Sequence, residues 1–171
     1  KQICSSVVSE GGYEQYSFGH VARRTAVLGT IGSTFLPIVS IRLKSTRLGA
    51  VVLPQRVQVL PTTSQNYEVA LVKNASLTGP TTWVNTTSNN VEMDVSSTGV
   101  SGGTIVQTDY VTSSGSGGTN PLADPAGYNW DLQLGSSLAG VSDIYTIQIR
   151  TVSGATTGDA VGSLTFWDLT G

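Results

Sequence analysis

Residues 39–44 read VSIRLK, and this short stretch predicts the fold class. Its apolar side chains alternate with polar or charged side chains at every second position. Successive side chains of a β-strand point to opposite faces, so this period places one set in a core and the other outside it. The stretch therefore predicts a half-buried strand with Val39, Ile41 and Leu43 facing inward.

The same alternation recurs from one end of the chain to the other. It is found in residues 56–59, 67–71, 91–95, 128–134, 145–150 and 164–166. Turn-forming residues separate these segments, and no window has apolar residues at helical spacing. Seven or more short strands of this kind predict an all-β fold, an antiparallel β-sandwich that is jelly-roll-like.

The length of 171 residues predicts a single β-sandwich domain over residues 1–171. The chain begins with Lys1, directly in the strand-like segment QICSSVVS. We interpret residues 1–35 either as part of the sandwich or as an extended arm or linking strands from a longer polypeptide.

The glycine-rich stretch GVSGGTIVQTDYVTSSGSGGTN covers residues 99–120. A phosphate-binding loop has glycines at fixed offsets, and a helix follows them. Here Asn120 and Pro121 follow the last glycines, and no helical period comes after them. We therefore expect a strand from Thr104 to Val111 and then an exposed loop.

The composition favours a particle shell or an extracellular β-protein over a cytosolic enzyme. Charged residues make up 12% of the chain, against about 25% in average globular proteins. Cys4 is the only cysteine, which excludes an internal disulfide and a CxxC motif. There is no apolar run of about 18 residues, so no membrane partner is expected.

The charges are unevenly distributed along the chain. Eight of the nine Lys and Arg residues lie within residues 1–73, and eight of the eleven acids lie after them. Such asymmetry points to partners. The basic half lacks a nucleic-acid motif and has little aromatic interleaving, so no nucleic acid is expected. We predict that Arg42, Lys44 and Arg47 form a subunit contact with acidic groups.

Candidate catalytic or metal-binding residues are sparse. His20 is the single histidine, and no nucleophile elbow occurs. Glu92 and Asp94 share one strand face, but no facing carboxyl group can be identified, so an outward polar face is expected. Neither a metal site nor a cofactor is predicted, and we expect a protein that is not an enzyme.

The aromatic residues leave one binding alternative open. Tyr128 and Trp130 lie on the apolar side of their segment and are predicted to be buried in the core. The position of Trp83 is undetermined, and Tyr110 and Trp167 complete the set. Exposed aromatic rings beside Asn or Asp would favour a sugar-binding platform.

Several phrases together resemble a known family. They are CSSVVSEGGYE (4–14), IVSIRLKST (38–46), LVKNASLTGPTTWV (71–84), VEMDVSSTGVSGGTI (91–105) and DYV (109–111). They resemble a recurrent module of virion structural proteins of tailed bacteriophages, over about residues 3 to 135. The resemblance is weaker in the last third of the chain, and it supplies no catalytic residues.

The resemblance implies a non-enzymatic structural protein located in the virion, either a capsid decoration (cement) protein or a fibre subunit. Its partners would be other capsid or fibre proteins. The many strand edges predict a homo-oligomer, with a trimer as the expected form. The alternative is a carbohydrate-binding or receptor-binding adhesin domain of a phage fibre.

Overall fold

A computed structural model describes residues 18–112, 132–152 and 157–170 of the chain. These residues form strands and no α-helix. The strands are β1 (Phe18–Ile31), β2 (Leu36–Leu43), β3 (Val52–Pro61), β4 (Asn66–Lys73), β5 (Ser76–Thr78), β6 (Val84–Asn85), β7 (Val91–Asp94), β8 (Gly99–Ser101), β9 (Thr104–Thr112), β10 (Ile144–Thr151) and β11 (Gly158–Asp168).

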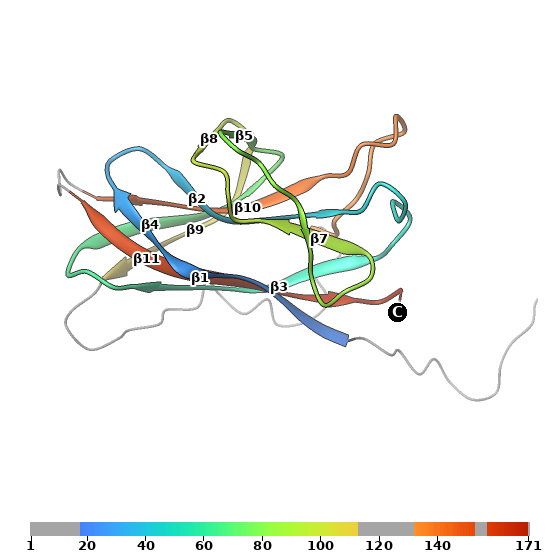
Figure 1. Ribbon diagram of the computed structural model, residues 1–171, viewed down its shortest axis with the longest axis horizontal. Helices are drawn as coiled ribbons and strands as arrows, with labels where there is room; N and C mark the ends of the chain where they lie inside the picture. Colours follow the sequence, from blue (N-terminus) through green and yellow to red (C-terminus); the bar gives the residue numbers. More distant parts are fainter. Residues whose placement is uncertain (1–17, 113–131, 153–156, 171) are drawn as a thin grey trace, which may run out of the picture.

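Two antiparallel sheets pack face to face, which confirms the all-β sandwich (Figure 1). One sheet has the order β1-β11-β3, and the other has the order β6-β7-β2-β10-β4-β9. The chain pairs with itself from its ends inward: β1 with β11, β2 with β10, and β4 with β9. An isolated bridge from Val52 in β3 to Leu134 continues this nesting. Nested antiparallel pairs divided between two sheets are the jelly-roll arrangement that the sequence predicted.

The main core fills the space between these two sheets. Val39, Ile41 and Leu43 are buried there, as their alternation predicted. The other core side chains follow the same period along their own strands. They include Val57, Val59, Tyr67, Val69, Leu71, Val91, Tyr145, Ile147, Ile149, Leu164 and Phe166.

A third, smaller layer covers part of the outer face of the six-stranded sheet. Strands β5 and β8 form a two-stranded sheet, which Figure 1 places above the larger sheets. Beneath it Ala70, Val72 and Ala75 are buried, and Val100 of β8 packs against them. Because this layer excludes water, the polar face of β2 is partly buried, and Ser40 bonds to Thr146 Oγ1 at 2.9 Å.

Two glycines of the glycine-rich stretch, Gly102 and Gly103, form the turn that leads from this small layer into β9, and the loop expected after β9 lies outside the described residues. Gly103 has φ +79°, and a Cβ added there would lie 2.7 Å from Ala75 N and from Lys73 O. The neighbouring Gly102 has φ +65° and open space around it. Thr104–Thr112 follows as strand β9, so the expected strand is confirmed.

Several expectations need correction or lie outside the described residues. Residues 18–31 form a strand of the sandwich rather than an arm, and residues 1–17 are not described. Of the expected strand 128–134, only residues 132–134 are described, and Leu134 makes an isolated bridge. The burial of Tyr128 and Trp130 therefore stays a prediction.

The tight turn at Gly103 gives the first testable prediction. Gly103→Ala should destabilise the protein by about 2–4 kcal/mol, because a left-handed residue with a Cβ is unfavourable and the contacted backbone atoms cannot move aside. Gly102→Ala is the matched control and should cost only about 1–2 kcal/mol, since its Cβ meets nothing. Equal losses in thermal unfolding for the two variants would contradict the close approach at Gly103.

Candidate functional site

The predicted contact residues lie together at one end of the six-stranded sheet. Arg42 lies near the end of β2, and Lys44 and Arg47 lie in the turn that follows. Backbone bonds from Arg47 N to Lys44 O (2.8 Å) and from Lys44 N to Asn90 O (2.9 Å) hold this turn against its neighbours. The positions of the three residues are therefore fixed by the fold.

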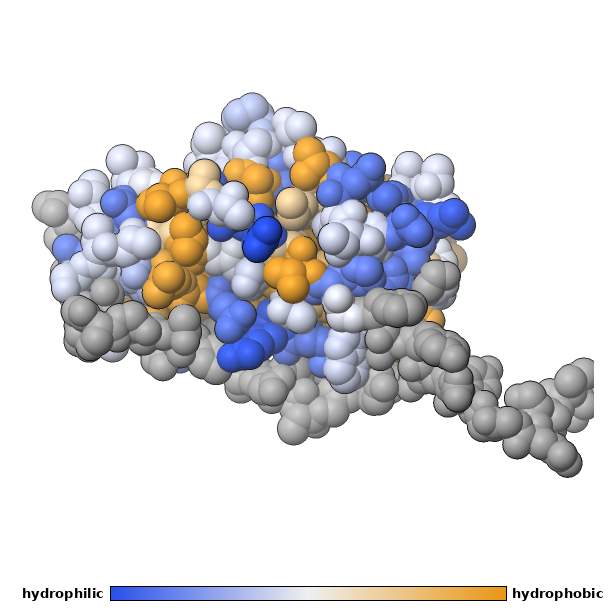
Figure 2. Space-filling model, turned by 60° about the horizontal axis from the view of Figure 1, so that its bottom comes forward, coloured by the Kyte–Doolittle hydropathy of each residue, from blue (hydrophilic) through white to orange (hydrophobic). Residues whose placement is uncertain are grey.

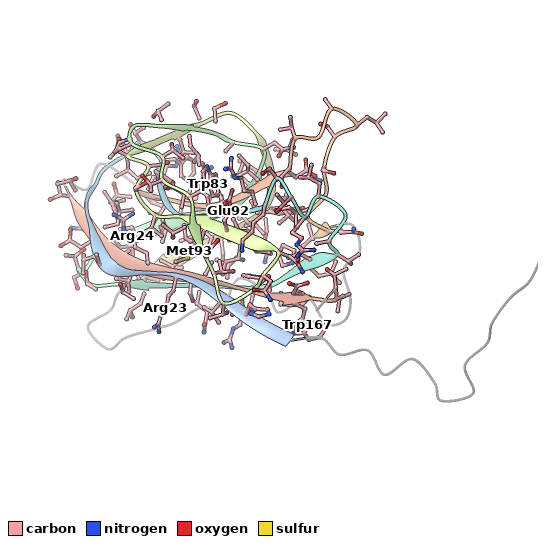
Figure 3. The ribbon with its side chains drawn as sticks, turned by 45° about the vertical axis from the view of Figure 1, so that its right-hand side comes forward. Arg23, Arg24, Trp83, Glu92, Met93 and Trp167 are labelled. Carbon is pink, nitrogen blue, oxygen red and sulfur yellow. The ribbon has the colours of Figure 1, made fainter. Side chains whose placement is uncertain are left out.

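Arg42 already has an acidic partner in its own chain. Its Nε donates to Glu92 Oε1 at 2.6 Å across the β2–β7 pair, where the two residues are direct neighbours. The guanidinium also lies over the Trp83 ring, 4.1 Å from its centre. Figure 3 shows Trp83 and Glu92 close together beside β7. The charge of Arg42 is thus largely neutralised within the domain.

Lys44 and Arg47 differ from Arg42 because neither forms an ion pair in the described structure. Arg47 is exposed and lines a hollow of about 300 Å³ together with Leu48, Asn90 and Thr170. The two side chains therefore offer uncompensated positive charge at this end of the molecule.

The loop at residues 135–143 places apolar side chains beside these charges. Leu138 is fully exposed and Val141 is 65% exposed. Ser137 N donates to Val141 O at 2.8 Å, and Gly140 N donates to Ser137 O at 3.0 Å. Val141 also lines a second hollow, of about 190 Å³, with Arg42 and Leu48. We call the surface of Lys44, Arg47, Leu138 and Val141 the basic end.

Some of the opposite charges in the two parts of the sequence pair with each other within the chain. Two of the three ion pairs join a base of the first part to an acid of the second part, namely Arg42 to Glu92 and Lys73 to Asp143, whereas the third joins Glu68 to Arg150. Antiparallel nesting brings distant segments into register, so these opposite charges meet. The asymmetry therefore contributes to folding as well as to the basic end.

The expected outward position of Asp94 is wrong, because this carboxylate is buried. Its oxygens accept hydrogen bonds from the backbone N–H groups of Thr82, Ser96 and Ser97 and from both serine hydroxyls. Burial opposes ionisation, but these hydrogen bonds outweigh it and hold the pKa of Asp94 below its ordinary value. Asp94 therefore joins the segment that follows β5, at Thr82, to the segment that precedes β8, at Ser96 and Ser97.

Asp168, at the end of β11, is also a buried carboxylate that accepts several hydrogen bonds. It accepts bonds from Ser88 Oγ (2.6 Å), from Asn90 Nδ2 (2.9 Å) and from Thr170 N (3.1 Å). Burial by itself would raise the pKa of Asp168, but these hydrogen bonds outweigh burial and hold the pKa below its ordinary value. No local pattern in the sequence predicts this cluster, since Ser88 and Asp168 are 80 residues apart in the chain.

His20 is a structural contact in the described part of the chain. Its Nδ1 lies 2.8 Å from Thr87 Oγ1, and its ring stacks on Phe166 with centroids 5.6 Å apart. Among residues 18–112, 132–152 and 157–170, no three His, Cys, Asp or Glu side chains converge to hold a metal ion. The ring connects β1 with the segment before β7 and with β11.

The other basic residues that the structure describes, Arg23, Arg24 and Arg56, lie on the three-stranded sheet. In Figure 3, Arg23 points away from the sandwich and Arg24 points into it. Arg24 Nη1 donates to Val95 O at 2.6 Å, and desolvation lowers its pKa while Asp94 opposes that effect. The space-filling view shows that polar groups divide the apolar side chains of this side into separate patches (Figure 2).

Comparisons with protein-family models, with characterised proteins and with solved structures find no match to this chain. Within the described ranges, no helix is long and apolar enough to cross a membrane. The functional argument therefore depends on the site geometry.

The buried carboxylates predict a pH dependence of stability. A folded-state pKa below the unfolded value of about 3.9 adds stability at higher pH, and this stability is lost as the pH falls below about 4. Asp168→Asn should lower the unfolding free energy at neutral pH by about 1–3 kcal/mol and flatten the acid limb of the curve. Urea unfolding at several pH values measures both effects.

Asp109→Asn is the control for that experiment. Among the described contacts its carboxylate accepts only from the adjacent Tyr110 N–H. It should therefore change stability by less than about 0.5 kcal/mol. An unchanged acid limb in the Asp168→Asn variant would show that the buried cluster does not control stability at low pH.

Proposed function

We propose that this chain is a non-enzymatic structural subunit of a tailed-bacteriophage virion, either a capsid decoration protein or a fibre component. The proposal rests on the resemblance of its sequence phrases to virion structural proteins and on its β-sandwich fold. The observation that carries it is the basic end, where two cations without an ion-pair partner in the described structure lie in the turn after β2, and the neighbouring loop 135–143 exposes apolar side chains.

The chemistry of the basic end suits a protein partner. Burial of an exposed leucine and valine in an interface stabilises the complex by about 25 cal/mol per Å² of apolar surface removed from water. Charged side chains around such a centre set the orientation and the encounter rate of two proteins. Lys44 and Arg47 therefore favour a partner that presents acidic groups around a small apolar hollow.

A protein partner fits this surface better than nucleic acid does. A nucleic-acid surface usually has a stripe of Lys and Arg with aromatic side chains between them. Here the two uncompensated cations lie in a turn beside a loop that exposes a leucine and a valine, and Arg42 with its aromatic neighbour Trp83 is neutralised by Glu92. We place the chain in the virion, in contact with other virion proteins, and we propose that it forms a homo-oligomer.

Charge reversal at the basic end tests the proposal. The double variant Lys44→Glu/Arg47→Glu should change the melting temperature little, because neither side chain has an ion-pair partner in the described structure. Its incorporation into particles should fall most at low salt and recover partly as salt rises, since the new repulsion from acidic groups is screened over about 8–10 Å. Particle composition after assembly at two salt concentrations measures this.

Arg56→Glu is the control, because Arg56 is an exposed base on the other sheet with no ion pair in the described structure. It should be incorporated normally. Arg42 is unsuitable for this test, since its reversal would place a carboxylate beside Glu92 and destabilise the fold. Normal incorporation of the double variant, or tight DNA binding by the unaltered protein at physiological salt, would contradict the proposal.

A second variant separates the apolar contribution from the charges. Leu138→Ser removes a side chain that is fully exposed, so the isolated domain should keep its stability within about 0.5 kcal/mol. If Leu138 enters a hollow of the partner, incorporation should fall by at least about tenfold in a competition with the unaltered protein. Equal incorporation in that competition would exclude Leu138 from the contact.

A further inference from the structure

Four side chains form a straight row across the outer face of the six-stranded sheet. Arg150 of β10 is the direct neighbour of Glu68 of β4, and Glu68 is the direct neighbour of Tyr110 of β9. Phe35, just before β2, lies under the Arg150 guanidinium at 4.5 Å. We call these four residues the cross-strand row. With strands about 4.8 Å apart, the row is about 15 Å long.

The centre of the row is a fixed, electrically neutral pair. Arg150 Nε and Nη2 both donate to Glu68 Oε2, at 2.7 and 2.6 Å. In the described structure Glu68 Oε1 makes no hydrogen bond, and 42% of the Arg150 side chain is exposed. The pair is therefore held in place by the sheet and by the Phe35 ring, yet it keeps hydrogen-bonding capacity toward solvent.

Tyr110 is the exposed aromatic end of the row. It is 62% exposed, although it belongs to a paired strand. Thr108 and Thr112 lie two residues to either side on the same sheet face, and both are exposed. Asn66, opposite Thr112, is also exposed. The ring is thus surrounded by hydroxyl and amide groups.

We propose that the cross-strand row binds a neutral carbohydrate. The face of a tyrosine ring is apolar and accepts the C–H face of a sugar ring, and its hydroxyl group accepts or donates a hydrogen bond. Hydrogen bonds to a carboxylate and a guanidinium are stronger than bonds between neutral groups. Because Glu68 and Arg150 cancel each other's charge, the row favours an uncharged polyhydroxyl ligand over an anionic or cationic one.

This binding activity goes beyond the proposed structural function and is independent of it. Along β10, the row at Arg150 and the basic end beside Ile144 are six residues apart, or about 20 Å. A variant in the row should therefore leave incorporation into particles unchanged. A failure to bind sugar would not affect the proposed role of the basic end.

The experiment is titration of the isotope-labelled chain, followed by amide NMR, with maltohexaose, cellohexaose or chitohexaose. At least one of these neutral sugars should shift the amide signals of β4, β9 and β10 around the row. Tyr110→Ala should weaken its affinity at least about tenfold, as removal of a central aromatic contact does. Tyr110→Phe keeps the ring and should retain affinity within about threefold.

Ile105→Ala is the matched control, because Ile105 is 55% exposed on the same strand but lies outside the row. It should bind the sugar as the unaltered protein does. No shift with any of the three sugars at about 10 mM, shifts confined to other surfaces, or undiminished binding by Tyr110→Ala would overturn the proposal. Stronger binding of a heparin hexasaccharide than of the neutral sugars would also overturn it.

Discussion

Strand β10 is the element on which the rest of the structure depends, because both of its faces are buried. Tyr145, Ile147 and Ile149 face the main core, and Thr146 and Gln148 are buried on the other side. A sheet covered on only one side would leave Thr146 and Gln148 in water. The small β5–β8 layer covers part of this outer face, and the hydrogen bond between Ser40 and Thr146 gives their buried hydroxyl groups a partner. The insertion between β4 and β9 is therefore part of the stability of the sandwich.

Two buried acidic residues bind the loop segments around the two sheets by hydrogen bonds. Asp94 and Asp168 are buried carboxylates that accept several hydrogen bonds from backbone N–H groups and short polar side chains. A buried carboxylate is stable only when such donors surround it. The many serine and threonine residues supply these donors, so part of the low charge content of the chain reflects internal construction as well as surface chemistry.

The two proposed binding regions lie toward opposite ends of the six-stranded sheet and differ in chemistry. The basic end combines exposed apolar side chains with positive charge, which suits an acidic protein partner. The cross-strand row combines an exposed aromatic ring with a neutral ion pair, which suits an uncharged polar ligand. A subunit with both regions could be attached to a particle by one end and contact a glycan with the other.

The inward-facing side chains of the main core could be predicted from the amino-acid sequence. Alternation with period two is a local property, and it correctly assigned Val39, Ile41 and Leu43 and the inward residues of five other described strands. It also identified the basic residues at the end of β2. The spatial neighbours of these side chains became known only from the three-dimensional fold: Arg42 with Glu92, Glu68 with Arg150 and Tyr110, and Asp168 with Ser88. Those neighbours are 42 to 82 residues apart in the chain, so nothing in the local pattern specifies them. The nested pairing of the strands sets them, and that pairing depends on how two sheets and a third layer bury their apolar faces together.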